Sequence, residues 1–239
     1  MAQFSGQTIL VTGASGGVGE AMVRRLGEQG ATVCLSGRNR KRLEEIAVAL
    51  PDGRGRCYPA DLTVEGELQK AAQCVLDENQ RLDAIVHCAA IIVLGEVATA
   101  TAEDFEKQFQ VNVIAPFRLT QLCLPALISA RGQVVFINSS AGRRAAAGVS
   151  QYAATKHALR AVADSLRDEC NAAGVRVCSL FLGSTATPMQ AAIRAEQERA
   201  YDPERLIQPA DVAEMVAAVM ALPRTAEVTD LVMRSTEKA

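Results

Sequence analysis

A tyrosine and a lysine in the second half of the chain have the types and spacing needed for proton transfer. Tyr152 and Lys156 are four residues apart in Gln151-Tyr-Ala-Ala-Thr-Lys156, and Ser139 lies thirteen residues upstream. On an α-helix, residues i and i+4 lie on the same face, so we expect the phenol and the ammonium to project into the same space. The spacing therefore predicts a phenol whose acidity is adjusted by a neighbouring cation.

This trio fits the needs of carbonyl reduction, in which a proton must reach oxygen while hydride reaches carbon. A free tyrosine has a pKa of about 10 and is a poor proton donor near neutral pH. Lys156 favours the phenolate electrostatically, so we expect it to lower the pKa of Tyr152, and an oxidised nicotinamide would act in the same direction. The hydroxyl of Ser139 can hold the substrate oxygen, as a preorganised donor placed where negative charge develops.

A glycine-rich segment near the N-terminus is the second chemical signal. Thr12-Gly-Ala-Ser-Gly-Gly-Val-Gly19 follows an apolar, strand-like run and precedes an amphipathic, helix-like run. Gly13 permits a tight turn, Gly17 lets the backbone approach a pyrophosphate, and Gly19 allows close packing of helix and sheet. The N–H groups at the start of a helix also attract phosphate. The segment therefore predicts a dinucleotide site.

In the order and spacing of these features, the chain resembles the short-chain dehydrogenase/reductase family. The family pattern Thr-Gly-x-x-x-Gly-x-Gly matches Thr12 to Gly19, and Tyr-x-x-x-Lys matches Tyr152 to Lys156. The resemblance runs nearly from end to end and includes the segment Gly183-Ser-Thr-Ala-Thr187-Pro188. It implies a catalytic tetrad, whose members are Asn112, Ser139, Tyr152 and Lys156.

The resemblance implies a role for each member of this tetrad. Tyr152 is the general acid in reduction and the base in oxidation, while Lys156 lowers its pKa and holds the nicotinamide ribose. Ser139 orients the carbonyl oxygen and is preferred over Ser140, because the family's serine lies thirteen residues before the tyrosine and three before a glycine. Asn112 is expected to keep a kink in its helix and to hold a water that passes protons to Lys156.

The resemblance also implies a nicotinamide dinucleotide site, with Asp61 on the adenine amino group and Thr187 on the nicotinamide carboxamide. Two segments depart from the family pattern: His87-Cys-Ala-Ala90 replaces Asn-Asn-Ala-Gly, and Leu182-Gly183 replaces Pro-Gly. We expect His87 to be a packed strand residue, since the tetrad already supplies acid and base. The implied cofactor-binding residues are Gly13, Ser15, Gly17, Val18, Gly19, Arg38, Asp61, Leu62, Cys88, Ala89, Tyr152, Lys156, Gly183, Thr185 and Thr187.

The end of the second predicted strand favours NADP(H) as the dinucleotide. NAD enzymes usually place an acidic side chain there for the ribose 2′-hydroxyl, but this sequence reads Leu35-Ser-Gly-Arg38. The planar guanidinium of Arg38 is suited to a 2′-phosphate. The alternative is that Arg38 belongs to a solvated helix start, and the family's second basic position, inside the glycine turn, is here Gly16.

Seven short apolar runs alternate with longer amphipathic runs, which predicts a single-domain, doubly wound α/β Rossmann fold with a parallel sheet of about seven strands and helices on both faces. The predicted strands are Thr8 to Thr12, Ala31 to Ser36, Arg54 to Tyr58, Ala84 to Cys88, Gln133 to Asn138, Val175 to Phe181 and Val228 to Met233. The predicted helices are Val18 to Gln29, Lys41 to Leu50, Val64 to Glu78, Ala102 to Ser129, Gln151 to Ala173 and Ala210 to Leu222.

Composition agrees with one catalytic domain spanning residues 1–239. The net charge is −2 and the sequence has no long basic stripe, so nothing supports nucleic-acid binding. No histidine stands at metal spacing, and no metal is expected. The most apolar stretch is expected at Ala84 to Leu94, which is too short to cross a bilayer. We expect a cytoplasmic protein that binds no membrane, with seven cysteines as small core residues: Cys34, Cys57, Cys74, Cys88, Cys123, Cys170 and Cys178.

The sequence names no substrate. By resemblance, specificity lies in the loops Ile91 to Val97, Ala141 to Ser150 and Met189 to Gln208, the last being a candidate lid, residues 189–208. Arg143 and Arg144 are candidates for an anionic substrate, although solvated arginines are the plainer interpretation.

Three functions remain open at this stage. The leading one is an NADP(H)-dependent oxidoreductase that interconverts a carbonyl and an alcohol, the second is a 3-oxoacyl thioester reductase, and the third is a non-catalytic dinucleotide sensor. A sensor has no need for Ser139, Tyr152 and Lys156 in register, so their presence favours an enzyme. Alanine and leucine lie on more than one side of the helices Ala102 to Ser129 and Gln151 to Ala173. With the resemblance, this predicts a homodimer or homotetramer.

Overall fold

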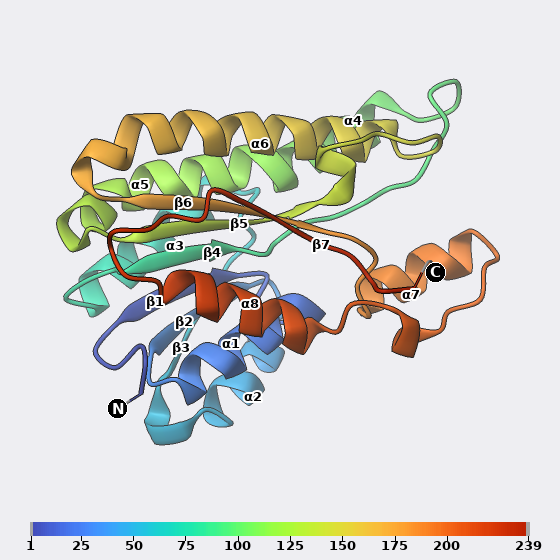
Figure 1. The fold of residues 1–239 in the computed structure, drawn as a ribbon. Helices are drawn as coiled ribbons and strands as arrows, with labels where there is room; N and C mark the ends of the chain where they lie inside the picture. Colours follow the sequence, from blue (N-terminus) through green and yellow to red (C-terminus); the bar gives the residue numbers. More distant parts are fainter. Residues whose placement is uncertain (1, 238–239) are drawn as a thin grey trace.

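The computed structural model describes residues 2–237, which form a seven-stranded parallel sheet with helices on both faces (Figure 1). The strand order is β3-β2-β1-β4-β5-β6-β7, and every pairing is parallel. The strands are β1 (Thr8–Thr12), β2 (Thr32–Gly37), β3 (Gly55–Pro59), β4 (Ala84–His87), β5 (Gln133–Ser139), β6 (Arg176–Leu182) and β7 (Asp230–Met233). The predicted Rossmann-like fold is confirmed.

The helices form two layers because the central strands are apolar on both faces. All of β1 and β4 is buried, as expected for a parallel sheet that is covered on each side. One core joins the sheet to α1, α2 and α8, and a second core joins it to α3, α5 and α6. The helices are α1 (Gly17–Glu28), α2 (Arg40–Val48), α3 (Glu65–Glu78), α4 (Ala102–Phe109), α5 (Ala115–Ala130), α6 (Ser150–Cys170), α7 (Pro188–Glu196) and α8 (Pro209–Met220).

The sequence located every strand, and the strands differ from the prediction only at their ends. Val175, for example, was expected to start β6, but its N–H bonds the carbonyl of Cys170 in a turn, so the strand begins at Arg176. The predicted helix Gln151 to Ala173 ends at Cys170 and continues as a 3-10 turn, Asn171–Ala173. The candidate lid contains α7 and a second 3-10 turn, Pro203–Arg205.

The predicted helix Ala102 to Ser129 is not uniform. It consists of α4, a π-helical turn at Gln110–Ile114 and α5, which contains Pro125. The whole segment Ala102–Ala130 is long and apolar enough to cross a membrane by length and composition, with a mean hydropathy of 1.5 in its best window. Unlike Ala84 to Leu94, this segment is long enough to cross a bilayer. In the structure it lies along the sheet, where α5 contributes to the second core (Figure 1).

The strand order reverses between β1 and β4, which places a crevice at the carboxyl ends of the two strands. Thr12 and His87 are paired in register at this edge. The hydroxyl of Thr12 accepts hydrogen bonds from the N–H groups of Cys88 and Ala89, both at 3.2 Å. These bonds hold the loops that follow the two strands together. A crevice at such a reversal is where open α/β sheets bind ligands.

Candidate active site

A cavity of about 950 Å³ opens at the carboxyl ends of the strands. Every residue that the resemblance assigned to cofactor binding lines this cavity, from the glycine turn through Arg38 and Asp61 to Thr187. Of the predicted tetrad, Ser139, Tyr152 and Lys156 line it, whereas Asn112 lies behind the wall. Tertiary structure thus brings together residues from both halves of the chain.

The glycine turn is shaped by two close backbone approaches. Gly13 has φ 62°, and a Cβ at this position would lie 2.8 Å from the amide nitrogen of Ala89. A Cβ at Gly19 would lie 2.1 Å from the carbonyl oxygen of Gly13, so the first turn of α1 packs directly on the loop. Any side chain at these two positions would force the turn apart. Gly17 lines the cavity, and a Cβ there would also meet the side chain of Thr187 at 2.9 Å.

The N-terminus of α1 offers unused hydrogen-bond donors to the cavity. Its N-cap is Gly16, which has no side chain to cap the helix. The first N–H groups of a helix have no acceptor within the helix, and here Gly17, Val18 and Gly19 all line the cavity. Backbone donors combined with the positive end of a helix suit a phosphate. The residues present therefore fit a dinucleotide.

Arg38 and Asp61 lie near each other at the other side of the glycine turn. Arg38 is exposed and follows β2, and Asp61 follows β3. The side chain of Asp61 accepts hydrogen bonds from the N–H and hydroxyl of Thr63, at 2.9 and 2.7 Å. These bonds, and then the charge of Arg38, lower the pKa of Asp61. Asp61 is thus an ionised acceptor at the predicted adenine position.

Ser139 and Tyr152 come from different elements and meet in the cavity. Ser139 ends β5, Tyr152 lies in the first turn of α6, and a hydrogen bond joins their side chains. The side chain of Asn138 donates to the carbonyl of Lys156 at 3.1 Å and accepts from the N–H of Ser139 at 2.7 Å. Asn138 therefore ties the end of β5 to α6. The role of Asn138 could not be predicted from the sequence, because an asparagine beside Ser139 has no distinctive pattern.

Lys156 is buried on the same face of α6, with 2% of its surface exposed. Its Nζ donates to the carbonyl of Ile137 at 3.2 Å and lies 5.7 Å from the centre of the Tyr152 ring. Burial lowers the pKa of Lys156 to about 8. The ammonium is therefore costly to keep charged, and an anionic or hydroxyl-bearing ligand in the cavity would stabilise it.

The expected lowering of the Tyr152 pKa is wrong for the protein without a ligand. Burial raises the pKa of Tyr152 to about 12, and the hydrogen bond with Ser139 opposes this rise only in part. Desolvation raises the pKa because the phenolate would be taken from water into a buried site. Near neutral pH the phenol therefore holds its proton, which is the form that a carbonyl reduction consumes.

Asn112 lies in the π-helical turn, where the resemblance implied a kink. Its side chain accepts from the N–H of Ile91 and donates to the carbonyl of the same residue, both at 2.9 Å. It also donates to the hydroxyl of Thr155 at 3.1 Å, and that hydroxyl donates to the carbonyl of Tyr152 at 2.8 Å. Asn112 thus joins the loop after β4 to the helix that carries the acid. Thr155 has no signal in the sequence.

The segment that departs from the family pattern has two different environments. His87 is buried, stacks on Phe136 with ring centres 5.0 Å apart, and shares a 2.9 Å hydrogen bond with Thr120. Burial lowers its pKa to about 3, so it is a neutral packed residue. Cys88 was expected both among the core cysteines and among the cofactor-binding residues, and it packs against the first core while lining the cavity. Burial raises the pKa of its thiol to about 12, with Lys156 opposing the rise.

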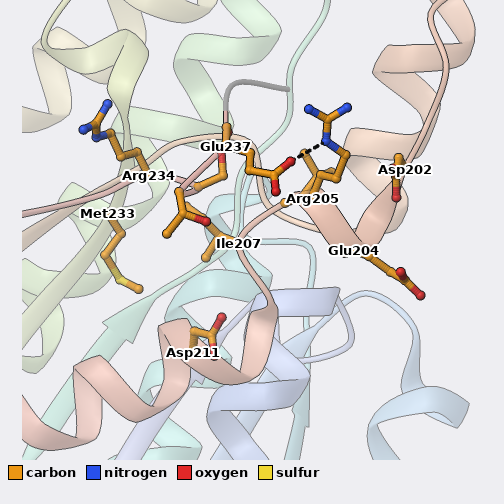
Figure 2. A pocket seen from close by; sticks show the side chains of 11 residues that line it. Asp202, Glu204, Arg205, Ile207, Asp211, Met233, Arg234 and Glu237 are labelled. Carbon is orange, nitrogen blue, oxygen red and sulfur yellow. Dashed lines mark hydrogen bonds and ion pairs between the residues drawn. The ribbon is translucent and has the colours of Figure 1, made fainter.

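A second cavity, of about 420 Å³, lies near the C-terminal end of the described chain. Figure 2 shows the side chains of Arg205 and Glu237 pointing toward each other at its rim, where they form a 2.9 Å ion pair. The lining residues come from positions 202–211 and 233–237 and include none of the predicted site residues. This cavity is not the site of the chemistry described above.

Comparison with known proteins agrees with this fold and identifies the family. A family model described as short chain dehydrogenase matches residues 7–198. The chain is 28% identical over 235 residues to an uncharacterized oxidoreductase of Staphylococcus epidermidis, a match that covers 98% of this chain and 99% of the relative.

Two solved structures show the same similarity. One is an alcohol dehydrogenase from the archaeon Thermococcus sibiricus complexed with 5-hydroxy-NADP, with 25% identity, a TM-score of 0.89 and 98% of each chain covered. The other is a variant of actinorhodin polyketide ketoreductase with NADPH, with 26% identity, a TM-score of 0.88 and coverage of 98% and 97%. The protein is a Rossmann-like oxidoreductase of the kind that uses a nicotinamide dinucleotide. Within that class, it belongs to the short-chain dehydrogenase/reductase family.

Proposed function

We propose that this protein uses NADP(H) to interconvert a carbonyl compound and an alcohol, with Tyr152 as the acid and base. The observation that carries the proposal is the shared cavity, in which a dinucleotide-binding turn and the Ser139–Tyr152–Lys156 group face the same space. The bound dinucleotide supplies or accepts the hydride. Tyr152 donates the proton to the carbonyl oxygen, and Ser139 holds that oxygen as charge develops on it.

Lys156 and Asn112 support the action of Tyr152 and Ser139. Lys156 is placed to hold ribose hydroxyls and to restore the positive charge that favours a phenolate during alcohol oxidation. Asn112 holds α6 and the loop that follows β4 in position. It also holds a water that passes protons to Lys156. Seven free cysteines, which persist as thiols in a reducing compartment, also lead us to propose a cytoplasmic location.

The choice of NADP(H) rests on Arg38. Its guanidinium lines the cavity, and within residues 2–237 it forms no ion pair. The two structures named above contain NADP-type ligands, which supports the same choice by analogy. Arg40 is the matched control, because it is an exposed arginine two residues away that pairs with Glu44 at 3.6 Å and does not line the cavity.

Titration of the purified protein with NADPH and with NADH, followed by nicotinamide fluorescence, tests the cofactor. We expect Arg38→Ala to weaken NADPH binding by about tenfold or more, through loss of a charge-assisted contact, and to leave NADH binding unchanged. Arg40→Ala should change neither affinity by more than about twofold, as a surface charge. Tighter binding of NADH than of NADPH by the parent would contradict the role of Arg38 and spare the tetrad.

A screen of carbonyl compounds with NADPH tests the reaction. Tyr152→Phe removes one oxygen and should lower kcat by about a hundredfold to ten-thousandfold, because the proton donor is lost. Its NADPH affinity should stay within about twofold of the parent, since positioning by Lys156 remains. A dinucleotide sensor would be favoured if the parent protein binds NADPH tightly but does not oxidise NADPH in the presence of any carbonyl compound in the screen.

A further inference from the structure

Arg194 is a mostly buried cation that lines the active-site cavity, and the described part of the chain gives it no partner. It lies on α7, is 7% exposed and lines the same cavity as Tyr152. Among residues 2–237, no acidic group or hydrogen-bond acceptor contacts its guanidinium. Its guanidinium nitrogens keep some contact with solvent, and the residue lines the cavity.

An unpaired buried charge is unfavourable, so its presence calls for a ligand. Buried arginines in proteins are normally paired or hydrogen-bonded, because removing a cation from water costs free energy. Arg176 shows the usual solution in this chain, since its guanidinium donates to four backbone carbonyls, the nearest at 2.9 Å. Arg194 has no such compensation inside the described structure. An anion from solution would supply it.

The charge of the surrounding wall points to an anion as well. The charged side chains that line the cavity are five cations and one carboxylate: Arg38, Lys107, Lys156, Arg194, Arg199 and Asp61. Asp61 is held by Thr63 beside Arg38, at the predicted adenine end. The neighbours of Arg194 on α7 that line the cavity are apolar or neutral, such as Gln190 and Ile193. Within residues 2–237, no carboxylate therefore competes for Arg194.

The position of Arg194 separates it from the predicted pyrophosphate site. The start of α7 touches the glycine turn, where Thr187 and Pro188 face Gly17. Arg194 lies six residues beyond Pro188, or about 9 Å further along the helix axis. Arg143, a candidate from the sequence, does not line the cavity and lies 5.7 Å from the ring centre of Phe181.

We propose that Arg194 binds an anionic group, a carboxylate or a phosphate, on the carbonyl substrate. The inference rests on the proposed oxidoreductase function and names its substrate class. The anion pairs with the guanidinium while the carbonyl lies at Ser139 and Tyr152. The apolar wall formed by Ile92, Leu94 and Ile193 accommodates the body of the substrate between the two groups.

Matched pairs of probes test this preference with NADPH as reductant. The carboxylate arm compares para-carboxybenzaldehyde with para-formylbenzamide, and the phosphate arm compares dihydroxyacetone phosphate with dihydroxyacetone. We expect kcat/KM to favour the anion in at least one arm by about thirtyfold, the size of a charge-assisted hydrogen bond. The arm with the larger ratio identifies the anion. Equal kcat/KM within both pairs would overturn the proposal.

Arg194→Gln should abolish the preference by lowering kcat/KM for the anionic probe alone. Arg194→Lys keeps the charge and should retain part of the preference, while the control Arg143→Gln should retain all of it. The NADPH affinity of Arg194→Gln should match the parent. A parallel loss of NADPH affinity would show that Arg194 binds the cofactor and would overturn the proposal, as would a full preference in Arg194→Gln.

A binding measurement separates this inference from the proposed function. Isothermal titration of the NADP complex with benzoate, and with benzamide as the neutral control, requires no turnover. Saturable binding of benzoate that disappears in Arg194→Gln supports the anion site even if no probe is reduced, a result that would count against the proposed reaction only. Equal binding of benzoate by the parent and Arg194→Gln, or none by either, would overturn the anion site.

Discussion

At the scale of single residues, the site is dominated by desolvation. Tyr152 has a pKa of about 12 and Lys156 a pKa of about 8, and both shifts arise first from burial. Each group is pushed toward its neutral form, since charge is costly in a site with little water. A bound dinucleotide and substrate would bring charges and hydrogen bonds that offset this cost. The ligand-free protein is therefore poised with its acid protonated.

The buried lysine makes the stability of the ligand-free protein depend on pH. Between pH of about 8 and the ordinary value of 10.5, the unfolded state binds more protons at Lys156 than the folded state. The free energy of unfolding therefore gains a contribution as pH rises through this window, and that contribution is missing near pH 7.

Lys156→Met removes this dependence. We expect the variant to be more stable than the parent near pH 7, by up to about 3 kcal/mol, with the difference shrinking as pH approaches the ordinary lysine value. Urea unfolding of both proteins at several pH values measures this. A difference in stability that does not vary with pH would contradict the assigned shift, and the variant should also lose activity.

At the scale of elements, the π-helical turn between α4 and α5 positions the catalytic helix. The extra residue of a π turn offsets the helix by part of a turn, and such turns are frequent at functional sites. Here the turn aims Asn112 at the backbone of Ile91 and at Thr155 on α6. A single buried amide thereby fixes the loop that walls the cavity relative to Tyr152.

Replacing Asn112 by alanine should lower the free energy of unfolding, because this connection is lost. Both backbone groups of Ile91 and the hydroxyl of Thr155 would lose a partner, so we expect a destabilisation of about 3 kcal/mol. Chemical denaturation measures it. Asn171→Ala is a control, because Asn171 is exposed and its side chain bonds only the side chain of Glu227, at 3.2 Å, so the change should cost less than about 0.5 kcal/mol. Equal effects of the two substitutions would contradict the role of Asn112.

At the scale of the whole molecule, apolar side chains remain exposed on α5. Phe117 and Ile128 are each 41% exposed and lie eleven residues apart, or about three helical turns, so they share a face. The sequence predicted that helices of this layer meet another subunit. We propose a homodimer or homotetramer in which this face of α5 is covered.

Phe117→Glu tests this assembly. A charge at the centre of an apolar interface should weaken association by several kcal/mol, because the carboxylate would be buried unpaired. Light scattering at micromolar concentration should then show a mass above one 25.4 kDa chain for the parent and a smaller mass for the variant. Arg118→Gln, a neighbouring exposed change, should leave the mass of the parent assembly intact. A monomeric parent would contradict the proposal.

The sequence by itself determined the features that depend on neighbours along the chain. Strand and helix periodicity placed all seven strands, the glycine turn matches the tight backbone at Gly13 and Gly19, and the four-residue spacing put Tyr152 and Lys156 on one face of α6. These properties follow from local backbone geometry, which repeats with a fixed period.

Tertiary structure decided the features that depend on what covers a group. The pKa of Tyr152 moved opposite to expectation because its burial comes from segments remote in sequence. Thr155 and Asn138 gained roles through partners on other elements, and Arg194 lines the cavity with no counter-ion among residues 2–237. Desolvation and pairing are set by distances across the fold, which no short stretch of sequence encodes.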